Sequence, residues 1–422
     1  MALPDPFVAA DVDGKRRTEV LETAASLIAS SGLRTSLQEI ADAAGILPGS
    51  LYHHFESKEA ILVELIRRYH DDLDRIGRIA LEKLDEADSR PASERIIALG
   101  SAIARCAAKH SAALQMSFYE APSSNRELVK LLQERPTGVQ QAMLQTLRAG
   151  RWSGYIRPDI DLPTLADRIC QSAMHAGLDV IRHNASPDQV ATVLCRIMLD
   201  GLAKQPPSDA ELDGSNAFGA AEEAIKTWAE EPAVNDKGAH VRAVARAEFG
   251  RKGYEVTTVR DIASAAGLGT GTVYRLIGSK DELLASIMLS FGTKVGGGFA
   301  TVLGSNATPI EKLDGLSWVF INALDQFPDE WKIQLAWMRQ SPPDTPNPGA
   351  LFTKRMRQLK SLLSEGIKSK KLRADNTSTE LLSRCVMDVL WMPENIVCEL
   401  GTRPALILAR DTVLRGVADR DA

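Results

Sequence analysis

The chain has 422 residues, of which 44% are hydrophobic and 25% charged, and its formal net charge is −5. Such values are typical of a folded protein with about two to four domains and exclude disorder on a large scale. No run of about 18 apolar residues appears, and the first residues carry acids instead of a basic segment followed by an apolar one. We therefore expect a cytoplasmic protein that contacts no membrane.

The five cysteines are scattered, form no Cys-x-x-Cys unit and have no histidine at metal-ligand spacing. This pattern predicts reduced, mostly buried thiols and no metal site. His53 and His54 are adjacent, but no third ligand lies nearby in the sequence. The mildly negative charge means that a nucleic acid would have to be bound by a local basic patch.

Apolar residues at helical spacing predict a first helix over residues 15–31, ended by Gly32. A second helix follows Ser36, whose partner three residues later is Glu39, the pattern of a capping box, and Gly45 ends it. Pro48 suits the first turn of a third short helix. A long fourth helix is expected from Lys58 towards residue 84.

This segment occurs twice in the chain. Residues 35–62 and 257–284 align without a gap, and 11 of the 28 aligned positions are identical. The second copy repeats the cap as Thr258 with Asp261 and adds another capping box, Ser279 with Glu282. We infer a duplicated module.

The duplication extends further along the chain. Gly150, followed by Arg157-Pro158-Asp159, is echoed by Gly366, followed by Arg373-Ala374-Asp375. No segment alternates as a strand does, so the predicted fold class is all-α, two tandem copies of a three-helix helix-turn-helix domain followed by a helical domain. The predicted domains are residues 15–62, 63–203, a linker over 204–236 with a short helix over about 217–230, then 237–285 and 286–417.

Three helices with a glycine-led turn between the second and third have the plan of a helix-turn-helix, whose third helix enters the DNA major groove. The Gly-x-x-x-Gly-[Ser/Thr]-[Leu/Val]-Tyr core, followed by Ser-Lys, resembles the tetracycline-repressor (TetR) family of bacterial regulators in both copies. The resemblance implies DNA-binding heads followed by variable helical domains that bind an inducer and dimerise. No nucleophile–base constellation or phosphate loop appears, so we expect no enzymatic activity and no cofactor.

Carried over by position, the resemblance implies two sets of DNA-contacting residues. Ser36 and Thr258 would touch phosphate at the start of the second helix, and Lys58 and Lys280 would do so at the start of the fourth. The recognition helices would present Pro48, Gly49, Ser50, Tyr52 and His53 in the first copy and Thr270, Gly271, Thr272, Tyr274 and Arg275 in the second.

The two heads depart from the family pattern and from each other. Many family members carry Lys where Pro48 and Thr270 stand, which removes a phosphate contact from both copies. Residues 15–62 contain five basic and six acidic side chains, whereas residues 237–285 contain eight and five. The second head is therefore the better electrostatic match to DNA.

Large side chains in the two helical domains are candidates for an apolar ligand cavity, although helical-bundle core is the alternative for each of them. The predicted ligand-binding residues are Phe118, Tyr119, Trp152, His175, Trp318, Trp337, Met338 and Trp391. Gly296-Gly297-Gly298 predicts either a loop at the base of the second helical domain or a hinge.

The sequence thus predicts a ligand-responsive repressor, released from a double-stranded DNA operator by a small apolar or aromatic inducer. Fusion of two subunits predicts an intramolecular pseudo-dimer whose unlike heads read different half-sites, and a further homodimer of chains stays open. The alternative is a sensor or interaction protein in which one or both heads no longer bind DNA.

Overall fold

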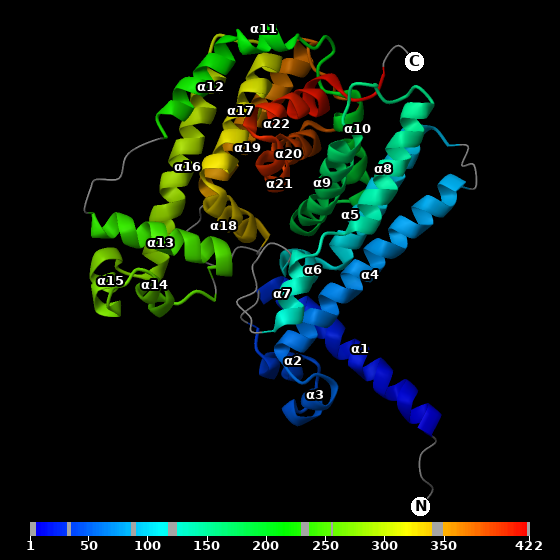
Figure 1. The fold of residues 1–422 in the computed structure, drawn as a ribbon, viewed down its shortest axis with the longest axis vertical. Helices are drawn as coiled ribbons and strands as arrows, with labels where there is room; N and C mark the ends of the chain where they lie inside the picture. Colours follow the sequence, from blue (N-terminus) through cyan, green and yellow to red (C-terminus); the bar gives the residue numbers. More distant parts are fainter. Residues whose placement is uncertain are drawn as a thin grey trace, which may run out of the picture.

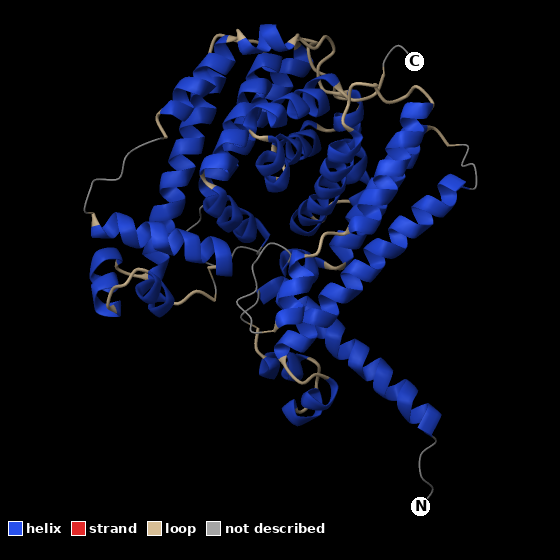
Figure 2. Cartoon of the chain, viewed as in Figure 1, coloured by secondary structure: helices blue, strands red, loops and turns tan. Residues whose placement is uncertain are grey.

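The computed structural model describes residues 6–31, 35–85, 90–116, 125–228, 236–254, 256–339 and 349–419. Over these residues the chain is helical, and extended backbone pairs only in two isolated bridges, so the all-α prediction is confirmed (Figure 2). The first copy comprises α1 (Pro6–Ser31), α2 (Leu37–Ala43), α3 (Pro48–His54), α4 (Lys58–Asp85), α5 (Ala92–Lys109), α6 (Ser111–Met116), α7 (Arg126–Gln133), α8 (Thr137–Trp152), α9 (Leu162–His183) and α10 (Pro187–Asp200).

The second copy follows the same plan after two short connecting helices (Figure 1). The connecting helices are α11 (Asp209–Asp213) and α12 (Asn216–Lys226). The second copy comprises α13 (Lys237–Lys252), α14 (Val259–Ala265), α15 (Thr270–Ile277), α16 (Lys280–Gly304), α17 (Pro309–Gln326), α18 (Pro328–Arg339), α19 (Gly349–Lys368), α20 (Thr379–Leu390), α21 (Glu394–Leu400), α22 (Thr402–Ala409) and the π-helical turn η1 (Arg410–Arg415).

The predicted capping boxes are present at the starts of α2, α14 and α16. Gly45 and Gly267 end α2 and α14 with φ of 64° and 65°, a left-handed conformation that favours glycine. Leu51 and Val273 bury the inner faces of α3 and α15. The capping box, the turn glycine and the buried apolar residue each serve the fold of a head, which explains why the two heads share them.

Helices of the first copy pack as α4 against α8 and α5 against α9 and α10, and α16 packs against α12 and α17 in the second copy. The length and composition of α16 would suit a membrane span, but 50% of its apolar window is buried in the protein. Gly296-Gly297-Gly298 lies within this continuous helix, so the predicted loop is wrong. A Cβ atom at Gly298 would lie 3.1 Å from Cγ1 of Val319, so this glycine permits close packing of α17.

The second copy interrupts one helix that is continuous in the first. In the register that aligns Gly150 with Gly366, α9 corresponds to α20 and α21 together. The break falls at Trp391, whose backbone is extended, with Pro393 two residues later. Proline cannot supply the backbone N–H that a continuous helix needs, and it disfavours helical geometry in the preceding residue.

The two copies join through reciprocal backbone hydrogen bonds. The N–H of Arg157 donates to the carbonyl of Val417, and the N–H of Arg373 donates to the carbonyl of Leu202, at N···O distances of 3.0 and 2.9 Å. Each copy thus pairs its Gly…Arg-x-Asp element with the end of the other copy. The same exchange forms the isolated bridges, Ile156 with Ala418 and Ala203 with Leu372.

Side chains at equivalent positions of α9 and α20 also cross this junction. Arg168 is fully buried and donates from Nη2 to the carbonyl of Val389 at 2.8 Å. Its counterpart Arg384 pairs with Asp179 at 3.0 Å between Nε and Oδ1. The junction is therefore fixed by side chains as well as by backbone.

The described part of the predicted linker is folded onto the second copy. Its helix α12 packs against α16 and α17. The buried guanidinium of Arg410 bonds to Asp209 and Asp213 of α11, and to Asp314 of α17 at 2.9 Å. Residues 204–228 therefore extend the second helical domain, and the short predicted helix over about 217–230 occurs as α12.

Candidate nucleic-acid interface and ligand site

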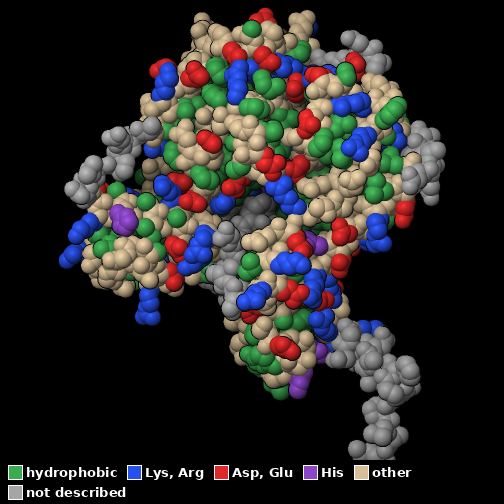
Figure 3. Space-filling model, viewed as in Figure 1, with side chains coloured by type: hydrophobic (Ala, Val, Ile, Leu, Met, Phe, Trp, Pro, Cys, Tyr) green, Lys and Arg blue, Asp and Glu red, His purple; other side chains and the backbone are tan. Residues whose placement is uncertain are grey.

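Both three-helix heads lie on the same side of the molecule, away from α11 (Figure 1). The second head, at the lower left, shows Lys and Arg side chains along its outer edge (Figure 3). The tip of the first head shows histidine beside an acidic side chain (Figure 3). The charge difference that the sequence predicts is thus visible on this face.

The recognition helix of the first copy presents most of the predicted residues to solvent. Tyr52 is 54% exposed, and Gly49 and His53 are exposed as well. Pro48 and Ser50 are half-buried at the start of α3. An exposed aromatic ring next to small residues suits contact with sugar, phosphate and base edges.

The second recognition helix has the same arrangement with different chemistry. Tyr274 is 51% exposed, beside exposed Arg275. Thr270 and Gly271 are exposed at the start of α15, and Thr272 is half-buried. A guanidinium at the place of His53 gives this head a bidentate donor for a guanine.

Ser36 and Thr258 lie at the predicted positions, but their hydroxyl groups are already engaged. Ser36 donates from Oγ to Glu39 at 2.8 Å, and Thr258 donates from Oγ1 to Asp261 at 2.6 Å. Hydrogen bonds from the Ser36 backbone and side chain hold the pKa of Glu39 below its ordinary value. A phosphate contact from either hydroxyl requires it to turn away from its carboxylate.

Lys58 and Lys280 are half-buried at the starts of α4 and α16. The Lys280 ammonium lies 4.2 Å from the centre of the Tyr254 ring, a cation–π contact that fixes the side chain at the edge of the head. Arg17 makes contacts within the first copy. Its guanidinium lies 4.6 Å from the centre of the Phe55 ring and pairs with Glu64.

Sequence reasoning missed one exposed residue of the first head. Leu47, the residue before α3, is 78% exposed, and Gly269 stands at this position in the second head. An exposed leucine beside a recognition helix can contact a thymine methyl group. The signal available in the sequence was a large apolar residue directly before Pro48, where the second copy has Gly269.

A cavity of about 280 Å³ lies between the two copies. One wall comes from α9 of the first copy, and the other walls come from α17, α18, α19 and α20 of the second. His175 and Trp391, which occupy equivalent positions in the two copies, stack with ring centroids 4.0 Å apart and planes at 15°. Both line the cavity, together with the apolar side chains of Leu178, Phe320, Leu335, Met356 and Met387.

Several residues that line this cavity carry buried polar atoms without hydrogen-bond partners among the described residues. Among the described residues, buried side-chain atoms without a partner include six from residues that line it. Arg355 is only 6% exposed, and Gln334 is 4% exposed. Buried polar atoms are usually hydrogen-bonded, so these groups are suited to binding a polar molecule. The six atoms are Nε and Nη1 of Arg355, Nε2 of Gln334, Oδ2 of Asp388 and Nε1 of Trp331 and Trp391.

The structure places the eight predicted ligand-binding residues in different environments. His175 and Trp391 line the cavity, and the other described members do not. Trp318 stacks on Phe218 of α12 at 5.6 Å between ring centroids. Trp152 is 91% exposed at the end of α8, so its predicted place in a cavity is wrong. Phe118, Tyr119 and the side chains of Trp337 and Met338 lie outside the described residues.

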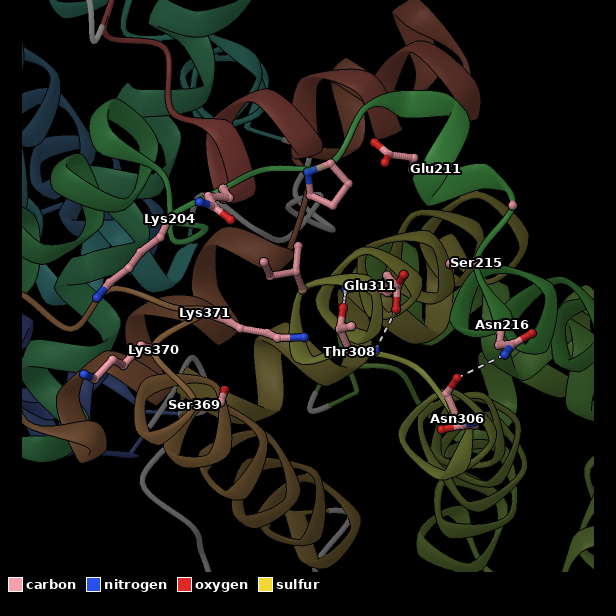
Figure 4. Close-up of a pocket in the computed structure, with 14 residues that line it drawn as sticks. Lys204, Glu211, Ser215, Asn216, Asn306, Thr308, Glu311, Ser369, Lys370 and Lys371 are labelled. Carbon is pink, nitrogen blue, oxygen red and sulfur yellow. Dashed lines mark hydrogen bonds between the residues drawn. The ribbon is translucent and has the colours of Figure 1, made fainter.

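A second hollow, of about 920 Å³, lies between the connecting segment and the ends of α16 and α19 (Figure 4). Several of its polar groups bond to one another, as when Asn216 donates to the carbonyl of Asn306 at 3.0 Å and the Thr308 N–H donates to Glu311. None of its lining residues carries one of the unpaired buried atoms found within the described ranges. We therefore place the candidate ligand site in the cavity between the copies.

Asp72, Cys106 and His110 form the metal-ligand-type cluster found among the described residues, with ligand atoms within 4.8 Å of one another. Asp72 already accepts from Lys109 and His110, both at 2.8 Å. Burial raises the pKa of the Cys106 thiol to about 12. Asp72 is therefore engaged in a salt-bridged cluster with Lys109 and His110.

The family described as "Bacterial regulatory proteins, tetR family" matches at residues 20–65 and 241–287. The HTH-type transcriptional repressor KstR2 of Rhodococcus jostii (strain RHA1) is 37% identical over 206 residues, which cover 47% of this chain and 97% of that repressor. KstR2 of Mycobacterium tuberculosis (strain H37Rv) is 32% identical over 194 residues, 45% of this chain and 94% of that protein.

The solved structure of the ketosteroid transcriptional regulator KstR2 of Mycobacterium tuberculosis is 30% identical, with a TM-score of 0.36, over 42% of this chain and 89% of that one. The first repressor is covered almost completely by about half of this chain. The chain therefore belongs to the TetR family of bacterial DNA-binding transcriptional regulators and carries two such units in tandem.

Proposed function

We propose that the chain represses transcription as an intramolecular pseudo-dimer, placing two unlike heads on one operator and leaving it when an inducer binds. The observation that carries this proposal is the reciprocal pairing of Arg157 with Val417 and of Arg373 with Leu202. Self-complementary exchange of this kind is how two copies of a subunit form a two-fold dimer. Here the same exchange operates within one chain.

The unlike heads imply an operator with two different half-sites. Arg275 suits a guanine, whereas His53 at the equivalent position, preceded by exposed Leu47, suits another base pattern. A single base contact of this kind contributes about 1–3 kcal/mol of discrimination. Each head should therefore protect its own half-site, one or more helical turns apart.

Footprinting on the DNA upstream of the protein's own gene tests this proposal. Arg275→Ala should weaken protection of one half-site, and His53→Ala should weaken protection of the other. Arg357→Ala, which changes an exposed arginine of α19 outside both three-helix heads, is the control and should change neither. Identical half-sites that are both insensitive to Arg275→Ala would rule out asymmetric reading.

We also propose that the inducer occupies the cavity between the copies. The relative whose structure is described as a ketosteroid transcriptional regulator suggests a fused-ring ligand. The aromatic walls of Trp391, Phe320 and Trp331 suit a flat apolar body. A ligand there would touch both copies and could change the spacing between the heads.

The cavity is connected to the second head through α18. Trp331 and Gln334 of α18 line the cavity, and the same helix packs against α13 of the head. Glu330 of α18 accepts from Arg246 of α13 at 3.2 Å. A Cβ atom at Gly250 of α13 would lie 3.0 Å from Cα of Asp329, so the two helices are in close contact.

Linkage gives a test of this coupling. A ligand that releases DNA must bind more weakly, by the same factor, to the DNA-bound protein. We would titrate androst-4-ene-3,17-dione as a fused-ring ketone probe into the free protein and into the operator complex. Equal affinity in the two states would rule out release through this cavity, even if the heads bind DNA as proposed.

The second candidate is a sensor in which one or both heads no longer bind DNA. It is favoured by the engagement of the Ser36 and Thr258 hydroxyls with carboxylates and by Pro48 and Thr270 at the place of a family lysine. Salt dependence of DNA binding separates the two candidates, because each lost phosphate contact lowers the slope. Solution mass with operator DNA would show whether one chain or two occupy it.

A further inference from the structure

We propose that the effector is an apolar carboxylic acid whose carboxylate is received by Arg355, and that each chain has one such site, shared between the copies. This inference rests on the proposed function for the role of the cavity as an effector site. It adds the chemistry of the ligand and the number of sites.

The first observation is the state of Arg355. Its side chain is buried and lines the cavity, yet two of its guanidinium nitrogens have no partner among the described residues. The other charged lining residues include matched pairs, such as Arg384 with Asp179 and Glu380 with Lys360. Within the described part of the chain, Arg355 is therefore a buried cation without a counter-charge, an arrangement that is costly unless an anion completes it.

A carboxylate is the anion that suits this position. The guanidinium is planar and can donate two parallel hydrogen bonds to the oxygens of a carboxylate. Burial lowers the pKa of Arg355 to about 10, so the side chain remains charged at neutral pH. The low polarity that causes this shift also strengthens an ion pair with a ligand.

The remaining polar atoms suit a neutral oxygen on the ligand. Among the described residues, the indole N–H groups of Trp331 and Trp391 and the amide of Gln334 are unpaired donors, and burial raises the pKa of Asp388, which favours its protonated form. These groups can serve a keto or hydroxyl oxygen. Apolar walls with a few convergent polar groups are the usual composition of a small-molecule site.

The first copy cannot form the same site. In the register that aligns Gly150 with Gly366, Val139 stands at the position of Arg355, and it is fully buried among apolar residues. Ser172 stands at the position of Asp388. The charge that defines the site is therefore present in the second copy alone, although α9 of the first copy supplies a wall.

The test uses two probes that share a flat apolar body, 1-pyrenebutyric acid and 4-(1-pyrenyl)-1-butanol, titrated into the full chain by calorimetry. We expect the acid to bind at least about tenfold more tightly than the alcohol, because a charge-assisted hydrogen bond contributes more than a neutral one. The expected stoichiometry is one acid per chain.

Arg355→Met keeps the length of the side chain and removes the charge. It should lower the affinity for the acid to that of the alcohol and leave the alcohol unchanged. Arg355→Lys should retain part of the preference, and Arg357→Met, on the exposed side of the same helix, should retain all of it. The melting temperature of Arg355→Met should equal or exceed that of the natural chain, because an unpaired buried charge is removed.

Equal affinities of the natural chain for acid and alcohol, binding of neither, or two acids per chain would overturn the assignment. An acid preference that survives in Arg355→Met, or is lost equally in folded Arg355→Lys, would overturn it as well. Acid binding that depends on Arg355 but releases no DNA would leave this assignment intact and contradict the proposed release. If the alcohol released DNA and the protein showed no preference for the acid, the Arg355 assignment would be overturned and the proposed release would stand.

Discussion

Gly201 and Gly416 meet backbone to backbone at the junction of the two copies. A Cβ atom on Gly201 would lie 2.4 Å from the Gly416 nitrogen, and one on Gly416 would lie 2.4 Å from the Asp200 carbonyl carbon. Both glycines have positive φ, 67° and 79°. These two positions thus have neither the space nor the backbone geometry for a side chain.

Gly201→Ala and Gly416→Ala should each destabilise the protein by about 2 kcal/mol or more, since the clash involves backbone that cannot move aside. Urea unfolding measures this loss. Gly297→Ala is the control, because no heavy atom lies within 4 Å of its Cβ position and it lies inside α16. The control should gain up to about 1 kcal/mol of helix stability. Alanine tolerated at 201 or 416 would contradict the close junction.

The three-helix heads could be predicted closely because local signals define them. Ser36 with Glu39 starts α2, Gly45 ends it, and Pro48 starts α3, all within one short stretch of sequence. Each signal acts on neighbouring residues, so no knowledge of distant contacts is needed. The exposed side of α3, with Tyr52 outward and Leu51 buried, agrees with what the resemblance implies for a recognition helix.

The ligand cavity could not be predicted in the same way. Arg355 and Asp388 stand alone on ordinary amphipathic helices, and their meeting with His175 depends on how two copies pack. Large aromatic side chains did not indicate the position of the cavity, because Trp152 lies on the surface and Trp318 packs against Phe218 of α12. The signal in the sequence was the change from Val139 to Arg355 between otherwise equivalent apolar positions.

Arg410 holds the connecting segment through a buried ion-pair network. Its guanidinium is fully buried and contacts Asp314, which is also fully buried, at 2.9 Å. Arg410→Met should cost about 3–5 kcal/mol, because Asp314 would remain as a buried charge without a partner. The double variant Arg410→Met with Asp314→Leu should recover most of that loss in urea unfolding.

Arg403→Met provides the matched surface control for this network. Arg403 pairs with Asp213 of the same segment, but its side chain is 46% exposed. Exposed ion pairs contribute about 0–1 kcal/mol, so this variant should be near neutral. Similar losses for Arg403→Met and Arg410→Met would show that burial does not set the strength of the network.

Lys58 and Lys280 should each contribute to the salt dependence of operator binding. If both lysines neutralise a phosphate, Lys58→Gln and Lys280→Gln should each lower the slope of log K against log salt by about 0.9. Fluorescence anisotropy of a labelled operator over a range of salt concentrations measures the slopes. Arg357→Gln should leave the slope unchanged. A slope that responds to Lys280 alone would show that the first head does not engage DNA.

Asp388 should make stability depend on pH in a direction opposite to that of Asp72. Burial, reinforced by Asp179, raises the pKa of Asp388, so the folded chain holds this proton more tightly than the unfolded chain. Its contribution to stability is then complete below the ordinary Asp pKa of about 3.9 and is lost as pH rises through the raised value. Asp388→Asn cannot ionise and should gain stability relative to the natural chain as pH rises from about 4 to 8.

Asp72→Asn is the opposing control in the same urea-unfolding series. Burial would raise the pKa of Asp72, but hydrogen bonds from Lys109, His110 and Arg75 hold it well below its ordinary value. Its contribution is therefore present above pH of about 4 and lost as pH falls, so Asp72→Asn should be least stable, relative to the natural chain, near neutral pH. If the Asp388→Asn difference followed the same sign as that of Asp72→Asn, the Asp388 carboxyl would be ionised in the folded protein, contrary to its raised pKa.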